Sequence, residues 1–204
     1  KNGRIDISVK QRFISKNKRT GFNHTHVYKI YPGGIIEMDN TFSLDKSAKD
    51  VPRVGLRMKM SSHLEDLAWF GRGPNENYVD RKAGSPISYY ESTVSEQYVP
   101  YVVPQENANK EDVRWLTLSN PKNKAGISIT GDKPFGFSAL HFTPEQMTAA
   151  YHPYEMTPNE EGTLLIDAVQ RGVGNTDTRN ALEKYRIKPG TYRLNLLIAF
   201  GDIN

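Results

Sequence analysis

Apolar and polar residues alternate along much of the chain, and this period of two is typical of β-strands with one buried face. The clearest runs are residues 54–60 and 192–200, in which every second residue is apolar. The same pattern predicts about eleven strands. The others are expected at residues 4–13, 24–31, 35–44, 65–70, 87–94, 113–118, 126–130, 136–141 and 163–170.

Turn-forming residues separate these runs. Pro32-Gly33-Gly34 lies between two predicted strands and indicates a hairpin. Residues 120–123 and 188–190 are predicted to form turns of the same kind later in the chain, because each combines proline with asparagine or glycine. The spacing of strands and turns therefore predicts an antiparallel arrangement.

One short helix interrupts the strands. Thr143 can cap it, Pro144 suits the first helical position, and Gln146 completes a capping box. Pro153 is expected to end the helix by about residue 151. No repeat or linker divides the chain, so we predict an all-β fold, a single large two-sheet antiparallel sandwich over residues 1–204.

Composition supports this fold and narrows the partners. The 204 residues include 11 Tyr, 8 Phe and 2 Trp, which favour strands. The net charge is +4, and its densest basic stretch, residues 16–19, lies between two predicted strands, where a solvated hairpin loop is expected. We therefore predict no nucleic-acid partner. No apolar run approaches the roughly 18 residues that span a bilayer, so no membrane partner is expected either.

The ends and the cysteine content say little about compartment. The chain starts at Lys1 without an initiator Met, which we interpret as a fragment or a trimmed N-terminal edge. Cysteine is absent, which excludes disulfides and thiolate metal sites but fits both reducing and oxidising compartments. No localisation is assigned.

A glycine-rich segment, residues 71–78, follows one predicted strand. It is not a phosphate loop, because a third glycine is missing and no helix follows. We predict a tight turn that displays Asn75, Glu76 and Asn77. These side chains could bind sugar hydroxyls or bond to the backbone of an irregular loop, and the second interpretation is favoured.

Aromatic residues give a second candidate for sugar contact. Trp69 precedes the glycine-rich turn, and Tyr98 and Tyr101 lie in a proline-stiffened segment. Aromatic rings stack on sugar C–H surfaces, but they equally fill cores and interfaces. Core or interface is the default interpretation.

The segment 172–180 has the composition of a functional loop. It carries two glycines and the hydrogen-bonding side chains Asn175, Asp177 and Arg179 between two predicted strands. Functional loops on rigid sandwiches have this composition, and so do plain Ω-loops, so the two interpretations stay open.

No catalytic group or metal is assigned to this chain. Glycosidase chemistry needs two facing carboxyl groups, and no acid of the sequence stands out from a surface acid. His24 and His26 flank Thr25 on one strand face, but no third metal ligand is indicated. His141 and His152 flank the short helix and are expected to position it, with no glutamate assigned to them.

Taken together, several segments resemble the C-terminal small-chain domain of the large β-galactosidases of glycoside hydrolase family 2, from about residue 39 to the end. The markers are residues 39–42, 52–56, 69–78, Asp80-Arg81, 96–101, 104–107, 112–115, 137–141 and 170–174.

The resemblance implies a supersandwich fold similar to that of aldose mutarotases. It implies a parent homo-oligomer that hydrolyses terminal non-reducing β-D-galactosyl residues with retention of configuration. Its catalytic glutamates, with Mg and Na ions beside them, would lie in an upstream TIM barrel, so this chain would carry no cofactor and be inactive alone. The implied partners are the upstream barrel and sandwich domains of the same polypeptide and galactosides.

The family's glycine loop usually ends in a Trp that contacts the sugar. In this chain Arg179 stands at that position, and arginine lacks the large apolar face of Trp. The departure implies another substrate or another aromatic in its place.

Three hypotheses follow for the function. The chain is an accessory domain that completes a galactosidase active site, a stand-alone carbohydrate-binding module, or a mutarotase-like enzyme, which would need a general acid and base at one sugar. A purely structural role is the fourth possibility.

Overall fold

The computed structural model describes residues 3–16, 19–174 and 181–203. Every strand pairing in it is antiparallel. The strands are β1 (Ile5–Ile14), β2 (Gly21–Tyr31), β3 (Ile35–Leu44), β4 (Arg53–Met60), β5 (Asp66–Arg72), β6 (Ile87–Thr93), β7 (Lys110–Ser119), β8 (Ala125–Leu140), β9 (Gly162–Gln170) and β10 (Thr191–Asp202). The helix α1 (Pro144–Ala149) and the short 3₁₀ turns η1 (Ser95–Gln97), η2 (Pro153–Glu155) and η3 (Glu183–Tyr185) complete the described elements.

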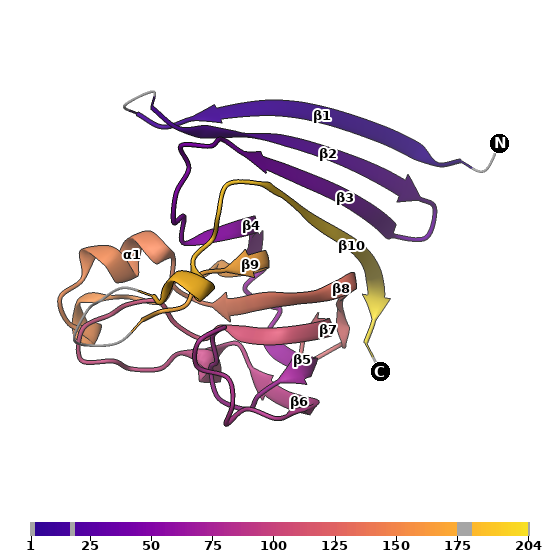
Figure 1. The fold of residues 1–204 in the computed structure, drawn as a ribbon. Helices are drawn as coiled ribbons and strands as arrows, with labels where there is room; N and C mark the ends of the chain where they lie inside the picture. The colour runs from indigo at the N-terminus through magenta and orange to yellow at the C-terminus, as the bar shows by residue number, and fades with distance from the viewer. Residues whose placement is uncertain (1–2, 17–18, 175–180, 204) are drawn as a thin grey trace.

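The strands follow one hydrogen-bonded path, in the order β1-β2-β3-β10-β8-β7-β5-β6, and β9 pairs with both β8 and β4. We call β1–β3 the arm and the elements from β4 to β9 the body. Figure 1 shows the arm above the body, with β4 and β9 between them and β10 bending from one to the other. The predicted all-β antiparallel fold with one short helix is confirmed.

One expected pair of strands is a single strand. Residues 126–130 and 136–141 were predicted to be separate, but β8 runs through both. The exposed Pro134 sits where the pairing with β7 is irregular, between the rungs Val113↔Phe135 and Trp115↔Thr130. Proline is tolerated at such irregularities because no ladder hydrogen bond is required of it there. The prediction of two strands was therefore wrong.

The local signals for the helix and the first hairpin are confirmed. Thr143 Oγ1 accepts a hydrogen bond from the backbone N–H of Gln146 at 3.2 Å, and Gln146 Oε1 accepts from the Thr143 N–H at 2.9 Å. The turn between β2 and β3 has Gly33 and Gly34 at positive φ, which glycine adopts without strain. The expected turn at residues 188–190 leads from η3, and not from a strand, into β10.

A single large cluster of buried apolar side chains connects β2, β3 and β10 with the body. Its fully buried members include Trp69, Leu116, Phe137 and Ile166. A second, smaller cluster around Met147 packs α1 against the body. Among the described residues, no helix is long and apolar enough to cross a membrane.

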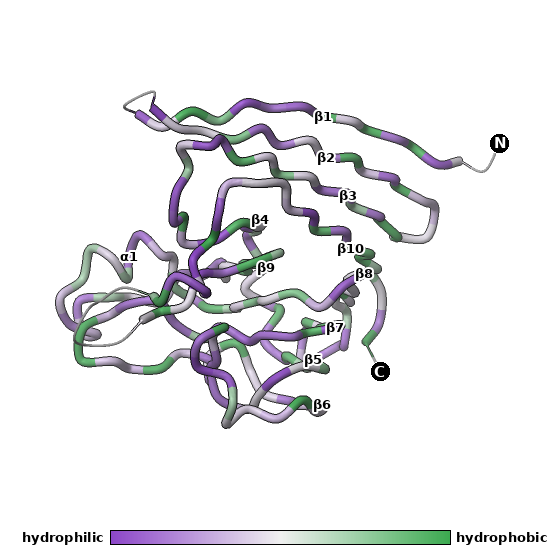
Figure 2. Tube along the Cα trace, viewed as in Figure 1, coloured by the Kyte–Doolittle hydropathy of each residue, from purple (hydrophilic) through white to green (hydrophobic). Residues whose placement is uncertain are grey.

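The arm is much less buried than the body. Nine of the ten residues of β1 are exposed, Val9 being half-buried, although Ile5, Ile7 and Phe13 are apolar. Figure 2 shows apolar and polar residues alternating along the arm strands. Buried hydrogen bonds connect β2 and β3 of the arm with β10. Asn40 donates to the Leu194 carbonyl at 3.0 Å, and its Oδ1 lies 3.1 Å from His24 Nε2.

Candidate functional site

A polar hollow of about 680 Å³ opens beside β5, between the loops that precede β6 and β7. Four of the six predicted carbohydrate contacts line it, namely Trp69, Asn75, Glu76 and Tyr101. Its other charged lining residues are Asp80, Arg81, Lys82, Glu91, Glu96 and Lys110. The fold therefore brings residues from three separate segments of the sequence to one place.

Glu76 organises one wall of this hollow. Its carboxylate accepts hydrogen bonds from Arg81 and from the hydroxyl groups of Tyr78, at 3.1 Å, and Tyr101. It also accepts from the backbone N–H of Ala108 at 2.8 Å. Burial and the neighbouring Glu76 charge raise the pKa of Tyr78, which keeps its hydroxyl protonated as a donor. Glu76 thus acts as an anchor for the loop between η1 and β7.

The other two predicted contacts do not line the hollow. Asn77 is fully buried, and its side chain bonds to the Asn75 carbonyl at 3.0 Å and to the Glu111 N–H at 2.8 Å. Tyr98 packs its ring against Phe142 in the small cluster beside α1. Asn77 therefore bonds to backbone groups, and the half-buried Tyr98 packs in an apolar cluster.

Lys110 lies at the floor of the hollow and is nearly fully buried. Its ammonium group donates to Gln97 Oε1 at 2.8 Å and to the Ala108 carbonyl at 3.1 Å, and it lies 5.4 Å from the centre of the Trp69 ring. Burial lowers the pKa of Lys110 to about 8, because desolvation disfavours the charged form, although Glu76 opposes this shift.

Asp80 lines the polar hollow and also bonds the start of the loop 172–180. Its carboxylate accepts from the consecutive backbone N–H groups of Val173, at 3.1 Å, and Gly174, at 2.8 Å. A Cβ on Gly172 would lie 2.3 Å from Asp80 Oδ2, so any larger residue there would force the Asp80 side chain to move. No local pattern connects Asp80 with this loop, because 92 positions separate it from Gly172.

The base of the loop is closed on the opposite side as well. The Gly172 N–H donates to the Tyr185 carbonyl at 3.4 Å, and Arg186 Nε donates to the Ala181 carbonyl at 3.0 Å. Arg171 bonds Asp50 at 2.8 Å. The candidate residues Asn175, Asp177 and Arg179 lie outside the described residues, but both of their flanks are fixed.

A second polar cluster lies on β4 and β9 and was not predicted. Arg53 pairs with Glu106 at 2.5 Å, and its Nη1 lies 3.6 Å from Asp167 Oδ2. Burial raises the pKa of Asp167 to about 7, although the Arg53 charge opposes this shift. Asp167 faces glycine on both neighbouring strands, Gly55 and Gly136. An acid within an apolar strand was the only sequence signal for it.

The histidines form pairs that the sequence did not assign. His24 and His26 have ring centres 4.6 Å apart, and their nitrogens bond Asn40 and Tyr28. His141 lies 2.9 Å from Glu65, and His152 lies 3.0 Å from Glu155; none of these four residues lines the polar hollow. Within the described ranges, no three His, Cys, Asp or Glu side chains are grouped to hold a metal ion.

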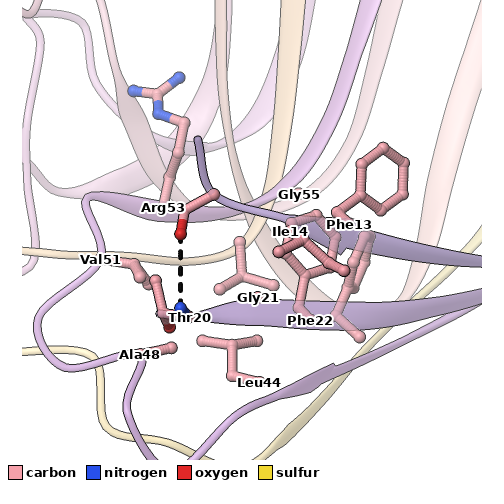
Figure 3. Close-up of a pocket in the computed structure, with 13 residues that line it drawn as sticks. Phe13, Ile14, Thr20, Gly21, Phe22, Leu44, Ala48, Val51, Arg53 and Gly55 are labelled. Atoms are coloured by element: carbon pink, nitrogen blue, oxygen red, sulfur yellow. Dashed lines mark hydrogen bonds between the residues drawn. The ribbon is translucent and has the colours of Figure 1, made fainter. Parts of the chain in front are cut away.

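An apolar hollow of about 360 Å³ separates the end of the arm from the body. Figure 3 shows Phe13, Phe22 and Leu44 from the arm and Val51 at the approach to β4 around it. None of the predicted site residues lines it. Its aliphatic and aromatic walls offer few polar groups to a sugar, in contrast to the hollow beside β5.

A family model described as "Beta galactosidase small chain" matches residues 1–198. The chain is 33% identical to a β-galactosidase of Priestia megaterium over 76% of this chain and 15% of that protein. It is 31% identical to that of Streptococcus thermophilus, over 86% and 17%. It is 25% identical to that of Actinobacillus pleuropneumoniae, over 96% and 19%. The chain therefore spans less than a fifth of the length of each of these relatives.

Two solved structures are similar to this chain at low sequence identity. A putative aldose 1-epimerase from Escherichia coli has a TM-score of 0.48 at 8% identity, covering 100% of this chain and 67% of that one. An aldose epimerase homologue from C. elegans has a TM-score of 0.45 at 10% identity, covering 99% and 66%.

Proposed function

The chain belongs to the β-galactosidase small chain family, and we propose that it works as the C-terminal domain of a β-galactosidase. In this proposal the parent enzyme hydrolyses terminal β-D-galactosyl residues with catalytic glutamates, and any metal ions, on an upstream TIM barrel. The domain contributes the loop 172–180 to the edge of that active site. The isolated chain is expected to hydrolyse no galactoside.

The observation that supports this role is the bonding of Asp80 to the start of the loop. A carboxylate that accepts from two successive backbone N–H groups makes strong, charge-assisted bonds. These bonds and the Gly172–Tyr185 bond hold Gly172–Gly174, while the bond from Arg186 to the Ala181 carbonyl holds the far end. A loop held at both ends can present its side chains to a substrate in one orientation, which is what positioning at an active site requires.

The test is a chimera in which this chain replaces the matched segment of the Priestia megaterium β-galactosidase. Asp80→Asn removes the charge and one acceptor from the Val173 and Gly174 amides, and we expect kcat/KM for a β-galactoside to fall about tenfold. Asp132→Asn is the matched control, because the carboxylate of Asp132 bonds Asn195 near the arm and not the loop. Equal kcat/KM for the Asp80→Asn and unmodified chimeras would contradict the proposal.

We also propose that the polar hollow contacts carbohydrate. Its four acids and its cations Arg81 and Lys82 offer donors and acceptors for sugar hydroxyls, although the Trp69 ring is itself buried. Titration of the chain with galactose and lactose by calorimetry tests this role. No measurable heat of binding with galactose and none with lactose would argue against this role.

A further inference from the structure

Another hollow, of about 560 Å³, lies over β5, β6 and β7, and we call it the outer hollow. Ala68 and Thr117 line it, whereas Trp69 and Leu116, their neighbours in sequence, are buried in the main apolar cluster. Successive side chains of a strand point to opposite faces of a sheet. The outer hollow therefore lies on the face that points away from the main cluster. None of the predicted carbohydrate contacts lines it.

Three aromatic rings cross this outer face in one row. Phe70 on β5 pairs with Tyr89 on β6 and with Trp115 on β7. The ring centres of Tyr89 and Trp115 are 5.9 Å apart, and Tyr89 is 51% exposed. Aromatic faces pack against the C–H surfaces of sugar rings. The row therefore offers a stacking surface that the described residues leave partly uncovered.

The charges of the outer hollow favour a neutral ligand. Its charged lining residues are Asp66, Glu91 and Lys124. Lys124 already bonds Asp66 at 2.7 Å, and Glu91 accepts a hydrogen bond from the Tyr89 hydroxyl. An anionic ligand would meet two carboxylates and only one ammonium group, which is itself paired. A ligand rich in hydroxyl groups, in contrast, finds carboxylates that accept and an ammonium group that donates.

The outer hollow adjoins the polar hollow at β6. Glu91 and Ser92 line both hollows. Because the two residues are consecutive in a strand, their side chains point to opposite sides of it. Ser92 Oγ accepts from Gln97 Nε2 at 2.8 Å, and Gln97 lines the polar hollow. Since β6 is at the end of the hydrogen-bonded path, this one strand separates the two hollows.

We propose that the outer hollow is a second saccharide subsite, continuous with the polar hollow across β6, and that the chain binds a neutral oligosaccharide. One sugar unit stacks on the rings of Tyr89 and Trp115. Glu91 accepts from hydroxyl groups where the saccharide crosses β6. This inference rests on the proposed carbohydrate contact of the polar hollow and extends it from one sugar to several.

A protein partner fits this face less well. The core of a protein interface is apolar and depleted of charged residues. In the outer hollow the short side chains of Ala68 and Thr117 lie on neighbouring strands, and the Asp66–Lys124 pair lines the same hollow. Ring faces next to a few hydrogen-bonding groups are typical of a small-molecule site.

Calorimetry with saccharides of two lengths tests the subsite. Galactose fits in the polar hollow alone, whereas a linear β-galactotetraose can reach both hollows. We expect the tetraose to bind about tenfold or more tightly than galactose, because only the tetraose stacks on the exposed rings. Tyr89→Ala should remove this difference by weakening the binding of the tetraose, and the affinity for galactose should stay unchanged.

Tyr154→Ala is the matched control, because Tyr154 is 81% exposed and lines neither hollow. It removes the same ring from the surface and should leave both affinities unchanged. Thermal unfolding checks that each variant is folded. Equal loss of tetraose affinity in Tyr89→Ala and Tyr154→Ala would overturn the subsite, since the effect would not depend on the outer hollow.

Fluorescence locates the bound saccharide, because the chain has only two tryptophans. Trp69 lines the polar hollow and Trp115 lines the outer hollow. The tetraose should change the tryptophan emission more than galactose does. Trp115→Phe should remove this excess while keeping the response to galactose.

The outcomes separate this inference from the role of the polar hollow. Galactose binding with no gain in affinity for the tetraose would overturn the outer subsite and leave the polar hollow as proposed. A gain that Tyr89→Ala leaves unchanged would also overturn it, because the further sugar units would then bind elsewhere. Absence of binding by both saccharides would contradict both proposals.

Discussion

The arm exposes isoleucine and phenylalanine to solvent, whereas the body buries a lysine and an aspartate. In the arm, Ile5 and Phe13 lie on a ladder that is paired on one side only. In the body, Lys110 and Asp167 are almost inaccessible, and their charges meet partners from distant segments. The arm is held by backbone hydrogen bonds between neighbours in sequence, and the body by side chains brought together from far apart.

The same substitution in the two regions gives the largest predicted contrast. Ile166→Ala empties a site that is 0% exposed in the main cluster and should cost about 2–5 kcal/mol of unfolding free energy. Ile7→Ala, at 43% exposure on β1, should change it by about 0.5 kcal/mol or less. Urea unfolding of both variants in dilute solution measures the difference. Similar costs would show that the arm is covered in solution.

The buried acid of the body predicts a pH dependence opposite in sign to that of the arm, where burial lowers the pKa of His24 on β2. The pKa of Asp167 is about 7 in the folded chain and near 3.8 when unfolded, so the folded chain holds its proton over this window. The contribution of Asp167 to the unfolding free energy should therefore fall as pH rises from about 4 to about 7, by at most about 1.4 kcal/mol per pH unit.

Asp167→Asn should remove this slope, because an amide does not titrate. Asp202→Asn, at the exposed end of β10, is the control and should keep it. Urea unfolding across the pH window measures both variants. An unchanged slope in Asp167→Asn would assign the pH dependence to other groups.

The smallest predicted effect concerns the join between Asp80 and the loop. Gly172→Ala puts a Cβ 2.3 Å from Asp80 Oδ2 and should cost about 1–3 kcal/mol through overpacking. Gly201→Ala on β10 meets nothing within 4 Å and should be nearly neutral. Thermal unfolding separates the two. A neutral Gly172→Ala would mean that Asp80 yields and that the loop is not fixed there.

The strands, the hairpin at Gly33-Gly34 and the capping box of α1 were predictable because each depends on residues close in sequence. The prediction of two separate strands within β8 was wrong. Proline is typical of turns, and only the irregular pairing of β8 with β7 shows that the strand continues through Pro134. The buried acids were missed for a related reason. A period of two shows which residues share a face, but an acid such as Asp167 is buried by partners from other segments.

The candidate site was likewise predictable only where it depends on residues close in sequence. The sequence singled out residues 69–78 and 172–180 separately. Asp80, which bonds the start of the second segment, was noted only as part of the family resemblance and was given no role, because a lone aspartate is usually a surface residue. Glu76 was named as a sugar contact, yet four hydrogen bonds give it a structural task that no local pattern encodes.

The position of β10 in the sequence sets the order in which strands can pair during synthesis on the ribosome. Residues 5–44 form the arm as a simple meander that can pair as soon as it emerges. β10, the last of the described strands to be synthesised, is also the one that pairs with both β3 and β8. The nascent arm and body are therefore tethered only by the segment after Leu44 until translation reaches Thr191. Until then the sides of β3 and β8 that await β10 stand open to chaperones and to other chains.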